Sequence, residues 1–350
     1  MTNNPNNRIA WLDAAKGIAI ILVVLGHIVQ NYTEHISFAF QLIYSFHMPA
    51  FFVFSGYLIN EDAPFLLYVK KKVKSLLLPY LVFATILFIY DVLSDILINK
   101  NTNAFTEFKE KLINTLLVFN SSYFFILWFL PCLFTALIIF FGVLKVLKNE
   151  LLRFITVSLL SITILFLKSK FVFELPLCAD TALFAVFWLY LGHFISYLKH
   201  KKSFSITHKT TVFIICSTIL LLINIIVFIT NHGALVFSFR NLYFNNIFVY
   251  ILTACFGTAA VILLGSILQN SKSLLLIGKE SLYIYGLHFI LIAVLAKLLF
   301  FIPSGILFEI IKTVIIALLA IYTIMFGLHF FRKIFCHKES KNENSSDCTD

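Results

Sequence analysis

The sequence predicts an all-α integral membrane protein, a bundle of about ten transmembrane helices with both termini in the cytoplasm. Three observations predict this class. Hydrophobic residues make up 60% of the 350 residues and charged residues only 13%, whereas an ordinary soluble domain has about 25% charged residues. Apolar stretches of about twenty residues, the length that crosses a bilayer, recur along nearly the whole chain. The basic residues lie in short clusters between these stretches.

The ten predicted spans are continuous apolar runs, and this continuity argues against the alternating pattern of a transmembrane β-barrel. Each run is long enough to cross a bilayer with some tilt. No small-residue cleavage site follows the first run, so we expect it to be retained as a helix and not removed as a signal peptide. The approximate bounds are residues 10–31, 41–60, 76–98, 124–144, 151–167, 180–198, 210–230, 246–267, 280–301 and 306–331.

The two sides that these spans define differ in basic residues. With the N-terminus inside, 19 basic residues fall in cytoplasmic segments and 6 in outer segments, as the positive-inside rule expects. The net charge of +10 therefore indicates topology, and no nucleic-acid surface is predicted. The inner residues are Arg8, Lys16, Lys70, Lys71, Lys72, Lys74, Lys145, Lys148, Arg153, Lys199, Lys201, Lys202, Lys209, Lys272, Lys279, Arg332, Lys333, Lys338 and Lys341, and the outer ones are Lys100, Lys109, Lys111, Lys168, Lys170 and Arg240.

Two segments outside the spans have a recognisable character. Residues 105–119 place apolar side chains at helical spacing, which predicts an amphipathic helix on the outer interface. Residues 336–350 are polar and aperiodic, which predicts a disordered cytoplasmic tail after a single membrane domain at 1–335. The six cysteines are irregularly spaced, so neither a disulfide framework nor a metal site is predicted.

The first span carries ionisable residues, which are costly inside a membrane and so require a partner, a wet cavity or a function. Its segment WLDAAKGIAIILVVLGH runs from Trp11 to His27. Asp13 and Lys16 are three residues apart and can neutralise one another. Lys16 and His27 are eleven residues apart, which places both on nearly the same helix face, about 16 Å apart along the axis. One face therefore carries a cation at its cytoplasmic mouth and an imidazole deep inside.

The second span contains the segment SFHMPAFFVFSGYL and places His47 about two turns from its outer end. His47 and His27 are therefore expected at similar depth. Pro49 removes a backbone donor and is expected to bend the helix just after His47, opening space beside the two imidazoles. Ser55 and Gly56 would allow close helix packing. The alternative is that the histidines only hydrogen-bond across helices.

With these two segments the sequence resembles membrane-bound acyltransferase family 3, and within it the fucose 4-O-acetylase-like sugar O-acetyltransferases. The resemblance rests on the pattern from Lys16 to His27, a basic residue and a histidine separated by ten residues, and on FHMPAFFVFSGYL. Lys16 stands where many members have arginine, so the charge is kept but the planar guanidinium is lost. Further landmarks are a basic run before Pro79-Tyr80, LWFLP at 127–131, LPLCADTALFAVFWLYLGH at 175–193 and IGKESLYIYGLH at 277–288.

The resemblance implies an O-acyltransferase of the inner membrane. It would move an acetyl or other short acyl group from acetyl-CoA, or another acyl-CoA, to a sugar hydroxyl of a cell-surface polysaccharide or its lipid-linked precursor. Acyl-CoA would be a donor substrate, and no tightly bound cofactor is expected. No extracellular esterase-like domain accompanies the spans, so the membrane domain alone is expected to perform the acceptor chemistry.

The catalytic candidates are His27, Lys16 and His47. His27 would act as the general base that takes the hydroxyl proton, or it would carry the acyl group covalently. Lys16 opens the polar face that leads to His27. His47 or His288 would orient the acceptor or stabilise the thioester oxyanion.

The binding candidates lie on both sides of the membrane. Acyl-CoA is a cytoplasmic polyanion, so Lys16, Lys72 and Lys74 are candidates to attract it; simple positive-inside anchoring is the alternative for the last two. For the acceptor sugar the candidates are Asp180, Trp128, Arg240 and His288. A solvated helix cap is the alternative for Asp180, and an interfacial aromatic belt for Trp128.

Two other functions are compatible with a polytopic membrane protein. A transporter or flippase for the glycan or its lipid carrier predicts inverted repeats and paired broken helices, which the sequence does not display. A structural subunit of a polysaccharide-synthesis complex would leave Lys16 and His27 without a function. The sequence does not define the sugar, the hydroxyl, the acyl group or the oligomeric state, and it leaves open a homo-oligomer or a polysaccharide-synthesis complex.

Overall fold

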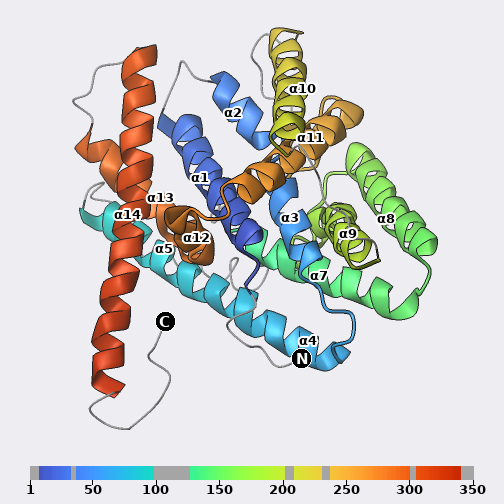
Figure 1. Ribbon diagram of the computed structural model, residues 1–350. Helices are drawn as coiled ribbons and strands as arrows, with labels where there is room; N and C mark the ends of the chain where they lie inside the picture. The colour runs from blue at the N-terminus through green and yellow to red at the C-terminus, as the bar shows by residue number, and fades with distance from the viewer. Residues whose placement is uncertain are drawn as a thin grey trace.

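The computed structural model describes residues 8–32, 37–97, 127–201, 209–230, 237–299 and 305–339. These residues form a bundle of helices with one short hairpin (Figure 1). Within them, ten helical segments are long and apolar enough to cross a membrane, which confirms the predicted class and number of spans. The segment at 105–119, predicted to be amphipathic, lies outside the described residues.

The structure defines the following bounds. The elements are α1 (Ala10–Tyr32), α2 (Ser37–Tyr44), α3 (His47–Tyr57), α4 (Phe65–Lys72), the π-turn η1 (Val73–Leu77), α5 (Leu78–Leu97), α7 (Phe129–Val146), α8 (Glu150–Lys170), the 3₁₀-turn η3 (Pro176–Cys178), α9 (Ala179–Lys201), α10 (Lys209–Thr230), β1 (Phe237–Ser238), β2 (Tyr243–Phe244), α11 (Ile247–Ile267), α12 (Lys272–Lys279), α13 (Ser281–Leu298) and α14 (Ile306–Glu339).

Polar residues start several of the apolar helices. Asn149 and Asn246 cap α8 and α11, because each side-chain oxygen accepts hydrogen bonds from the backbone N–H groups two and three residues later. Ser271 caps α12 by accepting from Leu274 N. Each cap satisfies donors that the first helical turn leaves open.

The second predicted span is two helices and not one bent helix. α2 ends at Tyr44 and α3 begins at His47, so the interruption precedes His47, and the predicted bend after it is wrong. Pro49 lies in the first turn of α3, where its missing N–H removes no intrahelical hydrogen bond. The break at Ser45 and Phe46 places His47 at the start of α3.

The third span is longer than predicted. A continuous helical segment begins at Phe65 and includes the lysine cluster, and η1 lies just before Pro79. A proline ring clashes with the carbonyl four residues earlier in a regular α-helix, and a π-turn relieves such local misfits. The helix therefore continues through a proline that would otherwise break it.

α1 lies in the middle of the bundle and packs against α3, α11, α12, α13 and α14 (Figure 1). Glycines permit the closest contacts. A Cβ on Gly278 would lie 1.8 Å from the Asp13 carbonyl oxygen, and one on Gly17 would lie 2.4 Å from the Leu274 carbonyl oxygen. The backbones of α1 and α12 therefore touch directly at the end of α1 that carries Lys16.

A second glycine contact joins α3 to α9. A Cβ on Gly56 would lie 2.0 Å from the Leu189 carbonyl oxygen, and one on Gly192 would lie 1.9 Å from the Val53 carbonyl oxygen. This reciprocal contact confirms that Gly56 allows close helix packing. It fixes α3, and with it His47, against α9.

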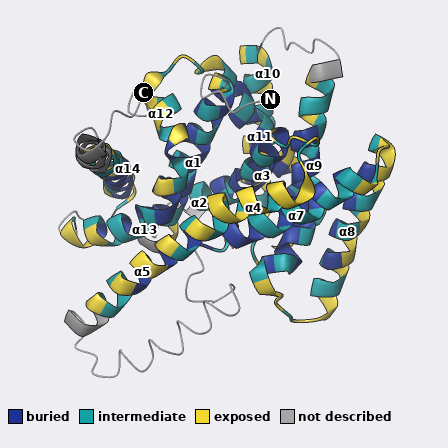
Figure 2. Cartoon of the chain, turned by 90° about the horizontal axis from the view of Figure 1, so that it is seen from below, coloured by how far each residue is buried: buried dark blue, intermediate teal, exposed yellow. Residues whose placement is uncertain are grey.

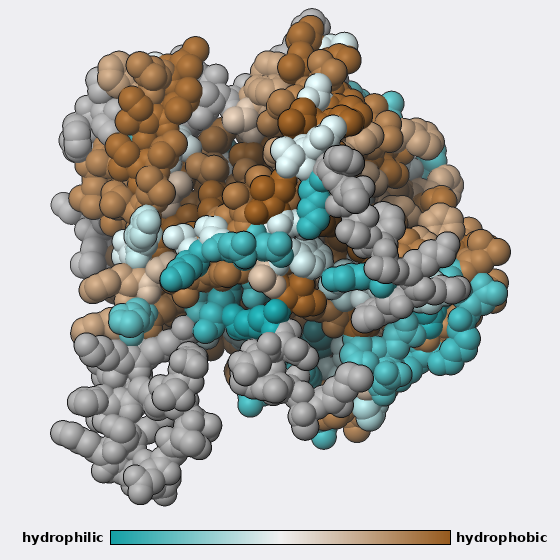
Figure 3. Space-filling model, viewed as in Figure 1, coloured by the Kyte–Doolittle hydropathy of each residue, from teal (hydrophilic) through white to brown (hydrophobic). Residues whose placement is uncertain are grey.

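The surface has the character of a protein in a bilayer. Exposed residues concentrate on peripheral helices such as α5 and α8, whereas α1 and α3 are mostly buried or half-buried (Figure 2). In α10, only Leu220 and Asn224 are buried, and several leucines and isoleucines face outward. Figure 3 shows hydrophobic residues over the upper part of one face and hydrophilic residues gathered below them. Outward apolar side chains match a lipid surrounding.

The last helix extends past the predicted end of the membrane domain. α14 continues to Glu339, beyond residue 336, where the sequence predicts the start of the tail. Residues 340–350 lie outside the described residues.

Candidate functional site

Three histidines from three helices meet around α1. The ring centroids of His27 and His288 are 5.1 Å apart. Tyr44 lies between the other pair, with its ring centroid 4.7 Å from that of His47 and 6.2 Å from that of His27. His27 and His47, which the sequence places at similar depth, thus both contact the ring of Tyr44, which lies between them.

The hydrogen bonds around these rings assign their tautomers. The Nδ1–H of His47 donates to the Ile43 carbonyl oxygen over 2.8 Å, because a carbonyl can only accept. His288 likewise donates from Nδ1 to the Tyr285 carbonyl oxygen over 2.8 Å. The lone pair of both imidazoles is therefore on Nε2.

His27 is oriented by a side chain that sequence reasoning did not single out. The Tyr44 hydroxyl donates to Gln30 Oε1 over 2.8 Å, and its oxygen lies 3.3 Å from His27 Nδ1. Since the hydroxyl proton is used toward Gln30, the Tyr44 oxygen can accept from His27 Nδ1–H. This arrangement leaves the His27 lone pair on Nε2, as a general base requires.

Only one of the three imidazoles is both accessible and at a cavity wall. A cavity of about 170 Å³, the His27 cavity, is bounded by His27, which is half-buried, and by His47, which is 4% exposed. His288 is fully buried and lines neither this cavity nor the cavity beside Lys16. The structure thus places the His288 ring against that of His27 and off the wall of the His27 cavity. The remaining walls of the His27 cavity are Val23, Gln30, Tyr44, Met48, Trp128, Ser238, Phe239, Arg240, Asn241 and Tyr285.

A second cavity, the Lys16 cavity, has a volume of about 400 Å³ and lies at the other end of α1. Lys16, Asp13, Arg8 and Lys279 contribute its charged walls. Lys16 Nζ is 3.7 Å from Asp13 Oδ1, and Arg8 lies 4.0 Å from the other carboxylate oxygen. The walls therefore carry three cations and one carboxylate, an excess of positive charge.

The two cavities meet at depth. Val23, Met48 and Tyr285 belong to the walls of both. Lys16, Ile20 and Val23 face the Lys16 cavity, and Val23 and His27 face the His27 cavity, so the stripe predicted on one face of α1 is confirmed. This stripe points into the protein and not toward lipid. The two cavities form adjoining compartments along α1.

Two of the predicted donor-binding lysines do not line the Lys16 cavity. Lys72 ends α4 with its Nζ 5.2 Å from the Tyr68 ring centroid, Lys74 lies in η1, and neither lines the Lys16 cavity. Lys72 nonetheless lies within electrostatic range of Lys16, and the other cations on the cavity wall are Arg8 and Lys279. The sequence assigns both to topology, although Lys279 lies in the landmark segment at 277–288. The packing of α12 on α1 brings Lys279 to the cavity.

The predicted acceptor residues gather at the end of the bundle opposite Lys16, which we call the Arg240 end. Arg240, in the turn between β1 and β2, lines the His27 cavity and a third cavity of about 250 Å³, the Asp180 cavity. Asp180 is neither a solvated cap nor free, because it is 3% exposed and its Oδ2 lies 2.6 Å from Lys168 Nζ. The Asp180 cavity is lined by Lys168, Phe171, Val172, Phe173, Glu174, Cys178, Asp180, Thr181, Arg240 and Asn241.

Trp128 borders the His27 cavity at the start of α7. Its ring stacks on Phe239, with the centroids 6.1 Å apart and the planes 29° apart. Trp128 is half-buried, so part of the indole faces the cavity. This position is compatible with contact to a sugar ring.

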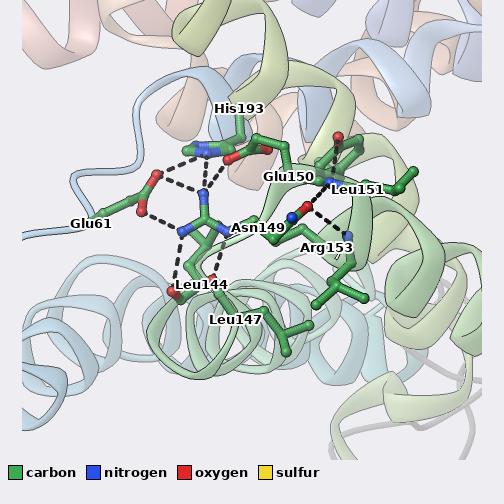
Figure 4. A network of polar contacts seen from close by, with 10 residues as sticks. Glu61, Leu144, Leu147, Asn149, Glu150, Leu151, Arg153 and His193 are labelled. Carbon is green, nitrogen blue, oxygen red and sulfur yellow. Dashed lines mark hydrogen bonds and ion pairs between the residues drawn. The ribbon is translucent and has the colours of Figure 1, made fainter.

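A buried ion-pair network at the Lys16 end escaped the sequence reasoning (Figure 4). The Arg153 guanidinium, on a residue only 4% exposed, pairs with Glu61 Oε2 over 2.7 Å and with Glu150. His193 Nε2 lies 2.9 Å from Glu61 Oε1. Glu61 follows α3, Glu150 and Arg153 begin α8, and His193 lies on α9. The network fixes the loop after α3 to two other helices.

Three residues of this network, Glu61, Glu150 and His193, have ligand atoms within 4.8 Å of one another, as a metal ion would require. The Arg153 guanidinium already lies between the two carboxylates and supplies their counter-charge. It also donates to the Leu144 and Leu147 carbonyl oxygens. Arg153 therefore already supplies the counter-charge of both carboxylates, while Glu150 Oε2 and His193 Nδ1 are buried with no hydrogen-bond partner among the described residues.

Two curated proteins are similar to part of this chain. Nodulation protein NolL of Sinorhizobium fredii (strain NBRC 101917 / NGR234) is 49% identical over 61 residues, which cover 16% of this chain and 17% of that protein. Nodulation protein NolL of Mesorhizobium japonicum (strain LMG 29417 / CECT 9101 / MAFF 303099) is 40% identical over 91 residues, 23% of this chain and 24% of that protein. The matched segments thus span about a quarter or less of these relatives. No solved structure gives a significant match.

The family comparison covers nearly the whole bundle. A family model described as an acyltransferase domain, acyltransferase family 3, matches residues 9–328. The match includes all ten candidate spans up to the last turns of α14. The chain therefore belongs to acyltransferase family 3.

Proposed function

We propose that this protein transfers an acetyl or other short acyl group from acyl-CoA to a sugar hydroxyl of a cell-surface polysaccharide or its lipid-linked precursor. The Lys16 end would face the cytoplasm, and the Arg240 end would face the outside of the inner membrane. Family membership supports acyl transfer, and the donor, acceptor and membrane are part of the proposal.

One observation carries the proposal: the Lys16 cavity and the His27 cavity share the walls Val23, Met48 and Tyr285. A donor entering past the cations at Lys16 and an acceptor entering past Arg240 would meet beside His27. Such a meeting point converts two substrates from opposite sides into neighbours held in one orientation. A transporter would need to move the whole glycan past the walls that the two cavities share, whereas an acyltransferase needs to move only an acyl group past them.

The proposed reaction is a direct transfer. His27 Nε2 takes the proton of the sugar hydroxyl as its oxygen attacks the thioester carbonyl carbon. The tetrahedral intermediate then expels the CoA thiolate with cleavage of the carbon–sulfur bond, and the proton on His27 passes to the thiolate. The products are the sugar ester and free CoA, and His27 returns to its neutral form.

The neighbouring side chains support different parts of this step. His47 has its Nε2 lone pair available because Nδ1–H is used toward Ile43, so we propose that it accepts a hydrogen bond from the acceptor. The Arg240 guanidinium is the fixed cation on the wall of the His27 cavity and suits the oxyanion or a neighbouring hydroxyl. Arg8, Lys16 and Lys279 would attract the polyanionic donor.

The first test replaces the proposed base. In membranes supplied with labelled acetyl-CoA and the unmodified glycan of a deletion strain, His27→Ala should lower transfer by ~10²–10⁴-fold, the contribution typical of a general base. His329→Ala is the matched control, because His329 is exposed on α14 and lines neither the Lys16 cavity nor the His27 cavity. Transfer by His27→Ala at the wild-type rate would contradict the assignment.

The second test separates the lysines. Lys16→Ala should raise the KM for acyl-CoA at least several-fold, because Lys16 lines the cavity, whereas Lys72→Ala should leave it close to wild type. The measurement is initial rate against acyl-CoA concentration at saturating acceptor. Equal effects of the two substitutions would show that only the general positive charge of this end matters.

A further inference from the structure

The turn that separates the His27 cavity from the Asp180 cavity is rigidly held. Arg240 and Asn241 form its tip and line both cavities. The Thr181 hydroxyl donates to the Arg240 carbonyl oxygen over 2.8 Å, and the Asn241 N–H donates to Ser238 Oγ over 3.4 Å. Leu242, which follows, has a left-handed φ of 51°. One fixed wall therefore divides two adjoining compartments.

Backbone conformations of positive φ also occur in the turn η3, beside the Asp180 cavity. Leu177 and Cys178 have φ values of 56° and 51°, and the Thr135 hydroxyl holds the Leu177 carbonyl oxygen over 3.0 Å. Together with Leu242 they are the non-glycine residues of positive φ in the described part of the chain. Cys178 lines this cavity, and Leu177 and Leu242 are next in sequence to the lining residues Cys178 and Asn241. Side chains rarely tolerate this conformation, which concentrates where a site must be held in shape.

The chemistry of the Asp180 cavity suits a hydroxyl-rich ring. The pair of Lys168 and Asp180 is buried in its wall and already neutralised. Arg240 and Asn241 present donors, and no ion-pair partner of the Arg240 guanidinium is found in the residues that the structure describes. At the rim, Phe171 is 60% exposed and offers an aromatic face. Fixed donors and acceptors beside an aromatic ring recognise a polar ligand with apolar C–H faces.

We infer, resting on the proposed function, that the acceptor is a glycan of at least two linked sugar units that occupies both cavities. The unit to be acylated lies in the His27 cavity, and its neighbour lies in the Asp180 cavity, with Arg240 and Asn241 contacting both. The enzyme therefore acts on an assembled glycan, polymeric or lipid-linked, in preference to a single sugar. The class of reaction that supplies its substrate is then glycosyl transfer, which must precede acylation.

The test uses fragments of the cell's own glycan. Unmodified glycan from a deletion strain is hydrolysed and separated into fragments of one, two and three sugar units, and the kcat/KM for labelled acetyl transfer from acetyl-CoA is measured with the purified full-length protein. We expect the two-unit fragment to exceed the one-unit fragment at least tenfold, with little further gain for three units.

Substitutions at the exposed rim localise the effect. Val172 is fully exposed and lines the Asp180 cavity, so Val172→Trp should obstruct that cavity without disturbing the core and bring the ratio of two-unit to one-unit kcat/KM to about one. Phe171→Ala should lower the same ratio by removing the aromatic face. Leu175→Trp is the matched control, because Leu175 is partly exposed on the same loop but is not a wall of this cavity.

The outcomes separate the two proposals. Equal kcat/KM for one-unit and two-unit fragments in the wild type, with transfer to both, would overturn the second sugar site and leave the acyltransferase intact. A ratio in Val172→Trp and Phe171→Ala that stays at the wild-type value would also overturn it. Transfer to no fragment and to no intact glycan would contradict the proposed function itself.

Discussion

The orientation of the His27 ring depends on one residue of its own helix and one of another. An imidazole inside a membrane protein is useful as a base only if its lone pair faces the substrate. Tyr44 at the end of α2 and Gln30 on α1 together direct the His27 lone pair to Nε2. In the proposed reaction His27 contacts the reacting atoms, and Tyr44 orients the His27 ring. Tyr44 is thus a positioning residue.

Tyr44→Phe tests this orientation. Removal of the hydroxyl takes away one of the contacts that hold the His27 ring, while the hydrogen bond with Gln30 is kept, so we expect kcat to fall roughly tenfold, less than the ~10²-fold or greater loss of a general base. The KM for acyl-CoA should not change, because Tyr44 lies outside the Lys16 cavity. Tyr243→Phe, which removes an exposed hydroxyl from β2, is the control. A KM effect in place of a kcat effect would contradict the positioning function.

At the scale of elements, glycine contacts decide how closely α3 and α1 approach their neighbours. The α3–α9 crossing depends on Gly56 and Gly192, each of which would clash with a carbonyl group if it carried a Cβ. Backbone atoms cannot move aside as a flexible side chain can. The position of His47 therefore depends on a contact about ten residues further along α3.

Gly192→Ala tests this crossing. We expect overpacking to lower the free energy of unfolding by about 1–3 kcal/mol and to reduce acyl transfer, because α3 is displaced. Thermal unfolding of the detergent-solubilised protein and transfer assays provide the measurements.

Gly142→Ala in α7 is the matched control, since nothing lies within 4 Å of a Cβ at Gly142. There we expect a gain of about 0.5–1 kcal/mol, because alanine favours a helix over glycine. The same response at both sites would mean that the α3–α9 contact is not limiting.

At the scale of the whole molecule, the Arg153 network joins elements that are far apart in sequence. Glu61 and Arg153 are 92 positions apart, and Arg153 and His193 are 40 positions apart. Lys145 on α7 also donates to the Glu61 carbonyl oxygen over 2.6 Å. The loop after α3 is therefore fixed to α7, α8 and α9 at one end of the bundle.

Arg153→Met tests the network. The substitution leaves two carboxylates without their counter-charge, so we expect a loss of about 3 kcal/mol, the lower end for a broken buried pair, because Glu61 is partly exposed and can turn toward water. Arg153→Met combined with Glu61→Gln removes one orphaned charge and should recover part of the loss. Equal thermal stability of the single and double variants would contradict the coupling.

The sequence by itself determined the membrane class, the ten spans, the family and the shared face of Lys16 and His27. These follow from composition and from the fixed rise and rotation of a helix, which act within one segment. The position of the break before His47 and the continuation of the helix through Pro79 did not follow, because a proline's effect depends on where in the helix it falls.

Only the tertiary structure decided which residues share a cavity. The Lys16 cavity and the His27 cavity adjoin. Arg8 and Lys279 line the Lys16 cavity whereas Lys72 and Lys74 do not, and His288 lines neither cavity. All of this depends on the packing of separate helices. Every apolar helix face is equally favourable next to lipid. The apolar pattern therefore predicts which segments cross the membrane but not which helix faces pack against one another. Here close glycine contacts and buried polar pairs made that choice.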